Sequence, residues 1–239
     1  MSGTATRTTR GNGRGMASDR ALAGRRALLA AGASGIAMAA LGVPIGARAE
    51  DRLPTPSQSI GPFYPYVPEV ERDADLVTVR GGTGIAKGDV TILSGRVLDA
   101  RGRPVASVRV EIWQCNAFGR YHHPRDNSNV PLDPNFQGYG ETVSTADGAY
   151  RFRAIKPVPY PGRAPHIHVR LSGRDFAPLA TQLYIAGHPQ NDGDFLLSSI
   201  VDPRARSSLL VAFRRVDGAD ALAASFDITL DNNGTLRRG

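Results

Sequence analysis

The stretch that decides the fold class reads Thr142-Val-Ser-Thr-Ala-Asp-Gly-Ala-Tyr-Arg-Phe-Arg-Ala-Ile155. Polar and apolar residues alternate in its second half, and residues two apart in a strand lie on the same face of a sheet. The pair Asp147-Gly148 between the two halves is a common turn sequence of tight hairpins. We therefore predict a β-hairpin at this position.

The same period of two continues on both sides of this hairpin. Further strands are predicted at residues 90–98, 108–114, 167–171, 181–185 and 225–230. Only residues 203–215 have a helical pattern. Several short strands with Gly- and Pro-rich connections predict an all-β fold, an antiparallel β-sandwich with one short C-terminal helix.

The chain divides into three predicted parts. Residues 1–49 are a leader, residues 50–88 are an extended arm, and residues 89–239 are the β-sandwich domain. The prolines between residues 51 and 75 exclude regular structure there, so we expect this arm to wrap around the sandwich. The sequence contains no internal repeat.

Composition and charge exclude several classes of protein. The 239 residues are 41% hydrophobic, which excludes wholesale disorder and a bundle of membrane helices. Cys115 is the only cysteine, so no intrachain disulfide can form, and we expect it to be a core thiol. The net charge of +7 resides mainly in the leader, because residues 50–239 hold 22 basic and 21 acidic residues. We therefore expect no nucleic-acid partner.

The leader has the pattern of an export signal. Arg25-Arg26 precedes an uncharged Ala- and Gly-rich stretch at residues 27–45, and Ala47-Arg48-Ala49 follows as a cleavage pattern. Adjacent arginines resemble the twin-arginine type, although Gly24 stands where Ser or Thr is usual. We expect cleavage near Glu50 and a periplasmic or extracellular protein with no stable membrane span. A retained membrane anchor or a disordered tail is the alternative.

A pair of histidines is the first indication of chemistry. His166 and His168 are two apart in a predicted strand, so both imidazoles lie on one face and can converge on a metal ion. Two polar residues on a sheet face would produce the same pattern. The sequence motifs around the pair distinguish a metal site from two polar residues on a sheet face.

The surrounding motifs resemble those of the intradiol ring-cleavage dioxygenases, with the protocatechuate 3,4-dioxygenase branch the most similar. The resemblance runs from about Thr55 to Asp231. Its motifs, in order, are Thr55-Pro-Ser-Gln-Ser-Ile-Gly61-Pro, Val110-Glu-Ile-Trp113-Gln-Cys-Asn116, Gly119-Arg-Tyr121, Asp133-Pro-Asn-Phe136, Thr145-Ala-Asp-Gly-Ala-Tyr-Arg-Phe152, Ile155-Lys-Pro-Val-Pro-Tyr160-Pro, Arg163-Ala-Pro-His166-Ile-His168 and Thr181-Gln182-Leu-Tyr184.

The resemblance implies a non-haem Fe(III) site and a role for each residue in it. The implied metal ligands are Tyr121, Tyr160, His166 and His168. Phenolate oxygens stabilise ferric iron, and the metal itself must drive their ionisation because a free tyrosine has a pKa near 10. The implied catalytic residues are Tyr160 as a base, Arg163 as the group that stabilises charge on the ring, and Gln182 as its neighbour. The implied substrates are a catechol-type diol and O2, and the product is a cis,cis-muconate.

The sequence also departs from the family pattern. Only five residues separate Tyr160 from His166, fewer than in protocatechuate enzymes, so we expect a more open pocket and no unique preference for a carboxylated catechol. No helix is predicted in residues 50–88, whereas the catechol and hydroxyquinol branches carry a helical dimerisation region. The need for a second kind of chain and the formation of a homo-oligomer stay open.

Two alternatives remain at this stage. The first is an exported transthyretin-like binding module without catalysis, which the presence of all four implied ligands argues against. The second is an extradiol Fe(II) oxygenase, which requires a carboxylate next to the histidine pair. The sequence offers no convincing carboxylate for that role.

Overall fold

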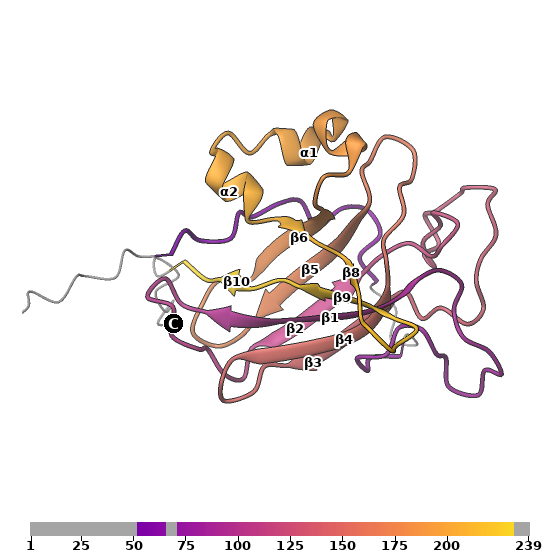
Figure 1. Ribbon diagram of the computed structural model, residues 1–239, viewed down its shortest axis with the longest axis horizontal. Coiled ribbons are helices and arrows are strands. Elements are labelled where there is room, and N and C mark those ends of the chain that lie inside the picture. Colours follow the sequence, from indigo (N-terminus) through magenta and orange to yellow (C-terminus); the bar gives the residue numbers. More distant parts are fainter. Residues whose placement is uncertain (1–51, 66–70, 232–239) are drawn as a thin grey trace, which may run out of the picture. The chain divides into compact units, whose positions relative to one another are not determined.

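The computed structural model describes residues 52–65 and 71–231, and their strands form two sheets (Figure 1). The first sheet contains β1 (Val90–Leu98), β4 (Ala149–Ile155), β8 (Arg214–Arg215), β9 (Leu222–Ser225) and β10 (Ile228–Thr229). The second has the order β3-β2-β5-β6-β7, with β2 (Arg109–Trp113), β3 (Tyr139–Val143), β5 (His166–Ser172), β6 (Leu179–Ile185) and β7 (Leu210–Val211). The predicted all-β sandwich is confirmed.

Apolar side chains from both sheets form the core. On β5, Ile167, Val169 and Leu171 are completely buried, which is the spacing of one face of a strand. Leu93 of β1 and Phe152 of β4 belong to the same buried cluster. Burial of a side chain of this size contributes about 1.5–3 kcal/mol. This inner face holds the sandwich together and leaves the opposite face of β5 to polar side chains.

The sheets are mixed, whereas the sequence predicted antiparallel pairing. β1 pairs with β4 in the antiparallel sense but with β9 and β10 in parallel, and β6 pairs in parallel with β7. Parallel neighbours require a crossover of a dozen or more residues. Residues 186–209 supply such a crossover between β6 and β7, so both sheets can be mixed.

The predicted hairpin at Gly148 is also wrong, although its turn forms with Gly148 at φ +74°. β3 pairs with β2 whereas β4 pairs with β1, so the two strands belong to different sheets. The carbonyl groups of Asp73 and Ala74 accept hydrogen bonds from the backbone N–H groups of Glu141 on β3 and Arg153 on β4, respectively. Residues 73 and 74 thus accept hydrogen bonds that β3 and β4 would have donated to each other in a hairpin.

The helix predicted at residues 203–215 is much shorter than expected. α2 covers Pro203–Ser207, and the Asp202 carboxylate caps it by accepting from the Arg204 N–H at 2.8 Å. The chain then forms β7 and β8, because Leu209 and Val211 are buried in the core cluster. The strand predicted at residues 225–230 is likewise divided, into β9 and β10.

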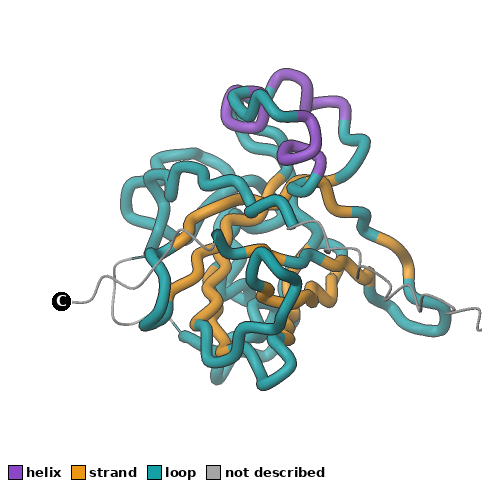
Figure 2. The backbone as a smooth tube through the Cα atoms, turned by 90° about the vertical axis from the view of Figure 1, so that its left-hand side faces the viewer, coloured by secondary structure: helices purple, strands orange, loops and turns teal. Residues whose placement is uncertain are grey.

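Two further helical segments were not predicted, the 3-10 helix η1 (Pro189–Gly193) and α1 (Phe195–Ser198). Each is about one turn long, so no helical period can appear in the sequence. Figure 2 shows the helical segments close to one another on one side of the strands.

Residues 52–65 contain no helix or strand and contact both sheets. The Thr55 N–H donates to the Thr229 carbonyl on β10 at 2.9 Å, and the Gln58 N–H donates to the Ala180 carbonyl on β6 at 2.8 Å. No helix among the described residues is long and apolar enough to cross a bilayer. The leader lies outside the described residues.

Candidate metal centre

The histidine pair lies on β5, on the face opposite the core. His166 and His168 alternate with the buried Ile167 and Val169, so both imidazoles project to the same side of the second sheet. Both are 1% exposed, and their Nε2 atoms are 3.2 Å apart. The Nδ1 of His166 is 2.7 Å from the Ala164 carbonyl oxygen, so an N–H at that position leaves the Nε2 lone pair available.

Two tyrosines from separate connections complete this group. Tyr121 lies between β2 and β3, and Tyr160 lies between β4 and β5. The ring centroids are 5.5 Å apart for Tyr121 and Tyr160, 5.4 Å for Tyr160 and His166, and 6.1 Å for Tyr121 and His168. The structure thus brings together all four residues predicted as metal ligands, which we call the tyrosine–histidine group.

The electrostatics of this group fit a metal cation. Burial raises the pKa of Tyr121 well above its ordinary value and raises that of Tyr160, where the Arg163 charge opposes the effect. Burial lowers the pKa of His166 to about 4 and that of His168 well below its ordinary value. The imidazoles are therefore neutral at pH 7, with lone pairs to donate, and the phenols ionise only beside a cation. The Tyr121 hydroxyl is also buried and faces the Tyr160 hydroxyl.

The tyrosines are necessary for any metal site at this position. Within residues 52–65 and 71–231, no three His, Cys, Asp or Glu side chains cluster closely enough to hold a metal ion. A site of two histidines and one carboxylate, as in Fe(II) oxygenases, is therefore not formed by these residues.

The two other predicted site residues, Arg163 and Gln182, lie beside the tyrosine–histidine group. The Arg163 guanidinium donates to the Gln182 Oε1 at 2.5 Å and to the Tyr160 hydroxyl at 3.4 Å. Gln182 is opposite His168 in the β5–β6 register, and its amide donates to the Ser59 carbonyl at 3.1 Å. A positive charge is therefore held next to the half-buried tyrosine.

Two aromatic residues pack directly on the predicted ligands, and sequence reasoning did not assign them this role. Trp113 stacks on His168 with ring centroids 4.7 Å apart, and Phe63 stacks on Tyr121 at 4.6 Å. Both residues adjoin or belong to the motifs quoted above. Trp113 meets His168 because β2 pairs with β5, and Phe63 meets Tyr121 because of the path of the arm. Neither contact follows from the local sequence.

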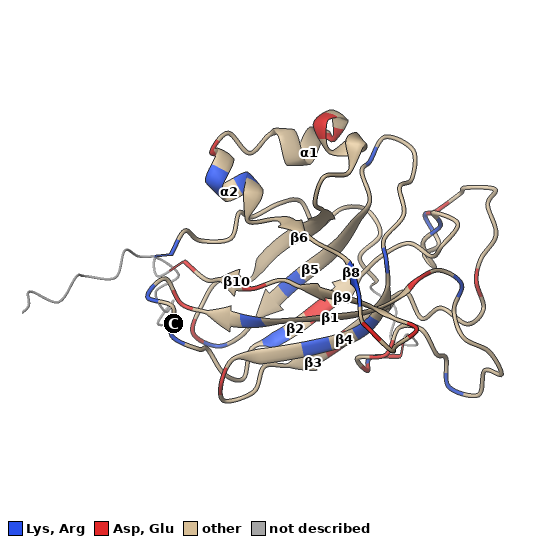
Figure 3. Ribbon diagram, viewed as in Figure 1, with Lys and Arg blue, Asp and Glu red and all other residues tan. Residues whose placement is uncertain are grey.

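A buried carboxylate anchors the arm beside this site. Glu111 on β2 is completely buried and accepts hydrogen bonds from the Tyr64 hydroxyl at 2.7 Å, the Tyr139 hydroxyl at 2.9 Å and the Arg170 guanidinium at 2.6 Å. The Tyr64 ring meets Trp113 edge-on at 5.0 Å. Figure 3 shows acidic and basic residues close together on β2 and β5. The arm, Trp113 and the histidine pair are thus one packed unit.

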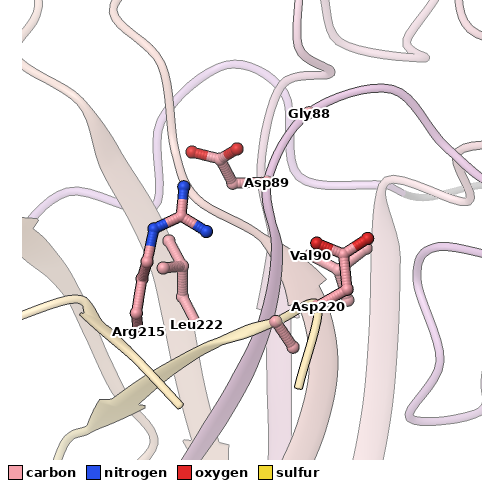
Figure 4. A pocket seen from close by; sticks show the side chains of 7 residues that line it. Gly88, Asp89, Val90, Arg215, Asp220 and Leu222 are labelled. Atoms are coloured by element: carbon pink, nitrogen blue, oxygen red, sulfur yellow. The ribbon is translucent and has the colours of Figure 1, made fainter. Parts of the chain in front are cut away.

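Among the cavities lined by described residues, two differ in their relation to the tyrosine–histidine group. A cavity of about 680 Å³ opens beside Tyr121 and is lined by residues of the β2–β3 connection. A separate cavity of about 280 Å³ is lined by Asp89, Arg215, Asp220 and their neighbours, and Figure 4 shows the Arg215 guanidinium facing the Asp89 carboxylate. This second cavity contains none of the predicted site residues. We take the tyrosine–histidine group as the candidate site, because the four predicted ligands converge there.

Comparison with known proteins identifies the class. A family model described as Dioxygenase matches residues 60–232, which is more than half of the chain. The protein therefore belongs to the intradiol dioxygenase family, as the motifs predicted.

The names of individual relatives state different substrates. The protocatechuate 3,4-dioxygenase beta chain of Burkholderia cepacia is 37% identical over 198 residues, 71% of this chain and 83% of that protein. A hydroxyquinol 1,2-dioxygenase of Rhizobium sp. (strain MTP-10005) is 31% identical over 182 residues, 68% of this chain and 56% of that protein. Among solved structures, the dioxygenase domain of a dioxygenase carbohydrate-binding protein fusion from Streptomyces sp. SirexAA-E is 31% identical. Its TM-score is 0.58, with 74% of this chain and 98% of that chain covered.

Proposed function

We propose that this protein opens the ring of catechol-type diols between the two hydroxylated carbons, using O2 and a non-haem ferric ion. The observation that carries the proposal is the convergence of Tyr121, Tyr160, His166 and His168 in one group. Two anionic phenolates favour ferric over ferrous iron, and two neutral imidazoles complete the donor set. A ferric ion held there would act as a Lewis acid on the bound diol and make a ring carbon reactive toward O2.

The overall reaction is balanced without a further reductant. The bond between the two hydroxylated carbons breaks, both oxygen atoms of O2 enter the product, and each of these carbons becomes a carboxyl carbon of a cis,cis-muconate. The protein must therefore bind the diol, accept its protons and stabilise the negative charge that develops on the ring.

The residues of the site are suited to these tasks. Tyr160 is half-buried, whereas Tyr121 is only 3% exposed, so Tyr160 is the ligand better placed to meet the diol and accept its proton at the phenol oxygen. The Arg163 guanidinium, held by Gln182 and close to Tyr160, stabilises negative charge at that position. Phe63 and Trp113 stack on Tyr121 and His168 and cover one face of each ring.

The proposal is tested by the metal content and activity of the pure protein. We expect about one iron per chain, a visible charge-transfer band from tyrosinate to Fe(III), and O2 uptake with a catechol that gives a muconate. His168→Ala should lose iron, the band and O2 uptake together, while His188→Ala, outside the group, should keep all three. Bound zinc without visible absorption would overturn the proposal.

The same measurements separate the two alternatives. A transthyretin-like binding module would be colourless and would consume no O2. An extradiol oxygenase would consume O2 but release a yellow semialdehyde in place of a muconate. The muconate product is therefore the decisive observation.

For the substrate, we propose a catechol without a required carboxyl group. The connection from Tyr160 to His166 is only five residues long, which leaves little chain to enclose a ring substituent. We expect protocatechuate to be turned over with kcat/KM less than about a hundredfold above that for catechol, a limit of roughly 2.7 kcal/mol. A kcat/KM ratio above that limit would show that the pocket recognises the carboxyl group of protocatechuate.

A further inference from the structure

A second buried carboxylate lies directly behind Arg163. Asp194 precedes α1, and its side chain is completely buried. One carboxylate oxygen accepts from the Arg163 Nε at 2.8 Å and from the Ala164 N–H at 2.9 Å. The other oxygen accepts from the N–H groups of Leu196 and Leu197, at 3.1 and 3.0 Å, and so caps α1. Asp194 joins this helix to the chain segment that carries Arg163.

The contacts of Arg163 show why this anchor is needed. None of the remaining partners of its guanidinium is a carboxylate: they are Gln182, the Tyr184 hydroxyl at 3.2 Å, the Tyr160 hydroxyl at 3.4 Å, and the Phe195 ring with its centroid 5.4 Å away. Asp194 is the only residue that forms an ion pair with Arg163 among those the structure describes. The Asp194 carboxylate adds the attraction of opposite charges to its hydrogen bond with the buried guanidinium, so we expect Asp194 to contribute most to the placement of this side chain.

The same carboxylate also affects the histidine pair through the backbone. Ala164 donates its N–H to Asp194 and accepts at its carbonyl from the Nδ1 side of His166. All four groups that hydrogen-bond to the Asp194 carboxylate are N–H donors. An Asn at this position would turn an NH2 group toward at least one of those donors, which leaves a buried polar group unsatisfied.

We propose that Asp194 is a positioning residue for catalysis: it holds the Arg163 guanidinium against Tyr160 and Gln182. This inference rests on the proposed function, since it assigns Asp194 a role in that same reaction. Asp194 does not touch the tyrosine–histidine group and acts through Arg163.

The test compares two helix-capping aspartates. Asp194→Asn should retain iron and the charge-transfer band but lower kcat for catechol by about tenfold to a hundredfold, the usual cost of losing a partner behind a metal site. Asp202→Asn is the matched control, because Asp202 caps α2 through the Arg204 N–H and is exposed. The control should change kcat by less than about twofold.

A second comparison separates positioning from a merely structural role. If Asp194 acts mainly through Arg163, then Asp194→Asn should change kcat by less than about twofold in an Arg163→Ala background, while its effect on the melting temperature persists. Asp194→Glu keeps the negative charge and displaces the carboxylate, and it should follow the same pattern if the Asn variant does not fold.

Two outcomes would overturn the proposal: equal losses of kcat in both backgrounds, or a loss no larger than that of Asp202→Asn. Failure of the proposed function is distinguishable, because the unmodified protein would then consume no O2 with any catechol.

Discussion

Tyr121 and Tyr160 differ in ways that assign them different tasks. Tyr121 is buried, is stacked by Phe63 and has its backbone N–H fixed by the Asp126 carboxylate at 2.7 Å. Tyr160 is half-buried and lies within 3.4 Å of the Arg163 guanidinium. A group that accepts a proton from substrate must be reachable, whereas a permanent ligand benefits from rigidity.

The first prediction follows from this difference. Tyr160→Phe should still bind iron but slow the binding of the diol at least tenfold, because the proton acceptor is lost. Tyr121→Phe should lower both iron content and the visible band, because a buried donor is removed. Stopped-flow absorption with catechol measures the first effect and metal analysis the second. Unchanged binding rates in Tyr160→Phe would show that the two roles are assigned wrongly.

Cys115 provides a second prediction at this scale. It is 1% exposed, and burial raises its pKa to about 12. The thiolate is the reactive form, so the folded protein should resist iodoacetamide at pH 8, whereas the unfolded chain, with a thiol pKa near 8.5, should be labelled. Mass spectrometry with and without denaturant measures this difference. Rapid labelling of the folded protein would contradict the predicted core thiol.

At the scale of elements, the arm is part of the site. Its Tyr64 hydroxyl donates to the buried Glu111, its Ser59 carbonyl accepts from Gln182, and its Phe63 ring covers Tyr121. The arm contains no helix or strand, so these contacts with the second sheet hold it in place. We infer that the arm supports the ligands in addition to closing the sandwich.

Gly61 allows this inference to be tested. It adopts φ +76°, and a Cβ at this position would lie 3.2 Å from the His168 Cε1. Gly61→Ala should lower both stability, by about 1–2 kcal/mol for the left-handed backbone, and iron content, because the His168 ring must move.

Gly218→Ala is the matched control for this variant. Gly218 has φ +73° and nothing within 4 Å of the added Cβ, so stability should fall similarly while iron content stays constant. Urea unfolding and metal analysis measure the two effects. Equal iron content in both variants would show that the arm does not support His168.

At the scale of the whole molecule, the site requires a folded chain. The predicted ligands lie at residues 121, 160, 166 and 168, on two loops and one strand, so their side chains converge only after the chain between them has folded. Metal binding and folding are coupled in such sites. Export after folding would allow the iron to be loaded in the cytoplasm, and we propose this as the purpose of the Arg25-Arg26 pair.

The prediction at this scale concerns that pair. Replacement of Arg25 and Arg26 by lysine should leave active, iron-containing precursor in the cytoplasm, because the twin-arginine route requires both arginines. Cell fractionation with O2 uptake in each fraction measures the outcome, and the N-terminal sequence of the exported form should begin near Glu50. Normal export of the variant would exclude this route and leave the catalytic proposal intact.

The sequence by itself predicted the longer strands, the fold class and the candidate site residues. β1 covers the predicted residues, and β5 carries His166 and His168 on one face, because the period of two is a local property of the chain. The family motifs supplied Tyr121, Tyr160, Arg163 and Gln182, which lie in loops and on a neighbouring strand, where no local pattern reveals a partner.

The tertiary structure alone decided which elements pair and what surrounds the ligands. The Asp147-Gly148 turn has the sequence of a hairpin, yet β3 and β4 enter different sheets because Asp73 and Ala74 take their hydrogen bonds. Asp194 stands in no quoted motif, and its role depends on four donors that converge only after folding. Local patterns determine strands because their periodicity is local, whereas pairing and burial depend on contacts between residues far apart in the chain.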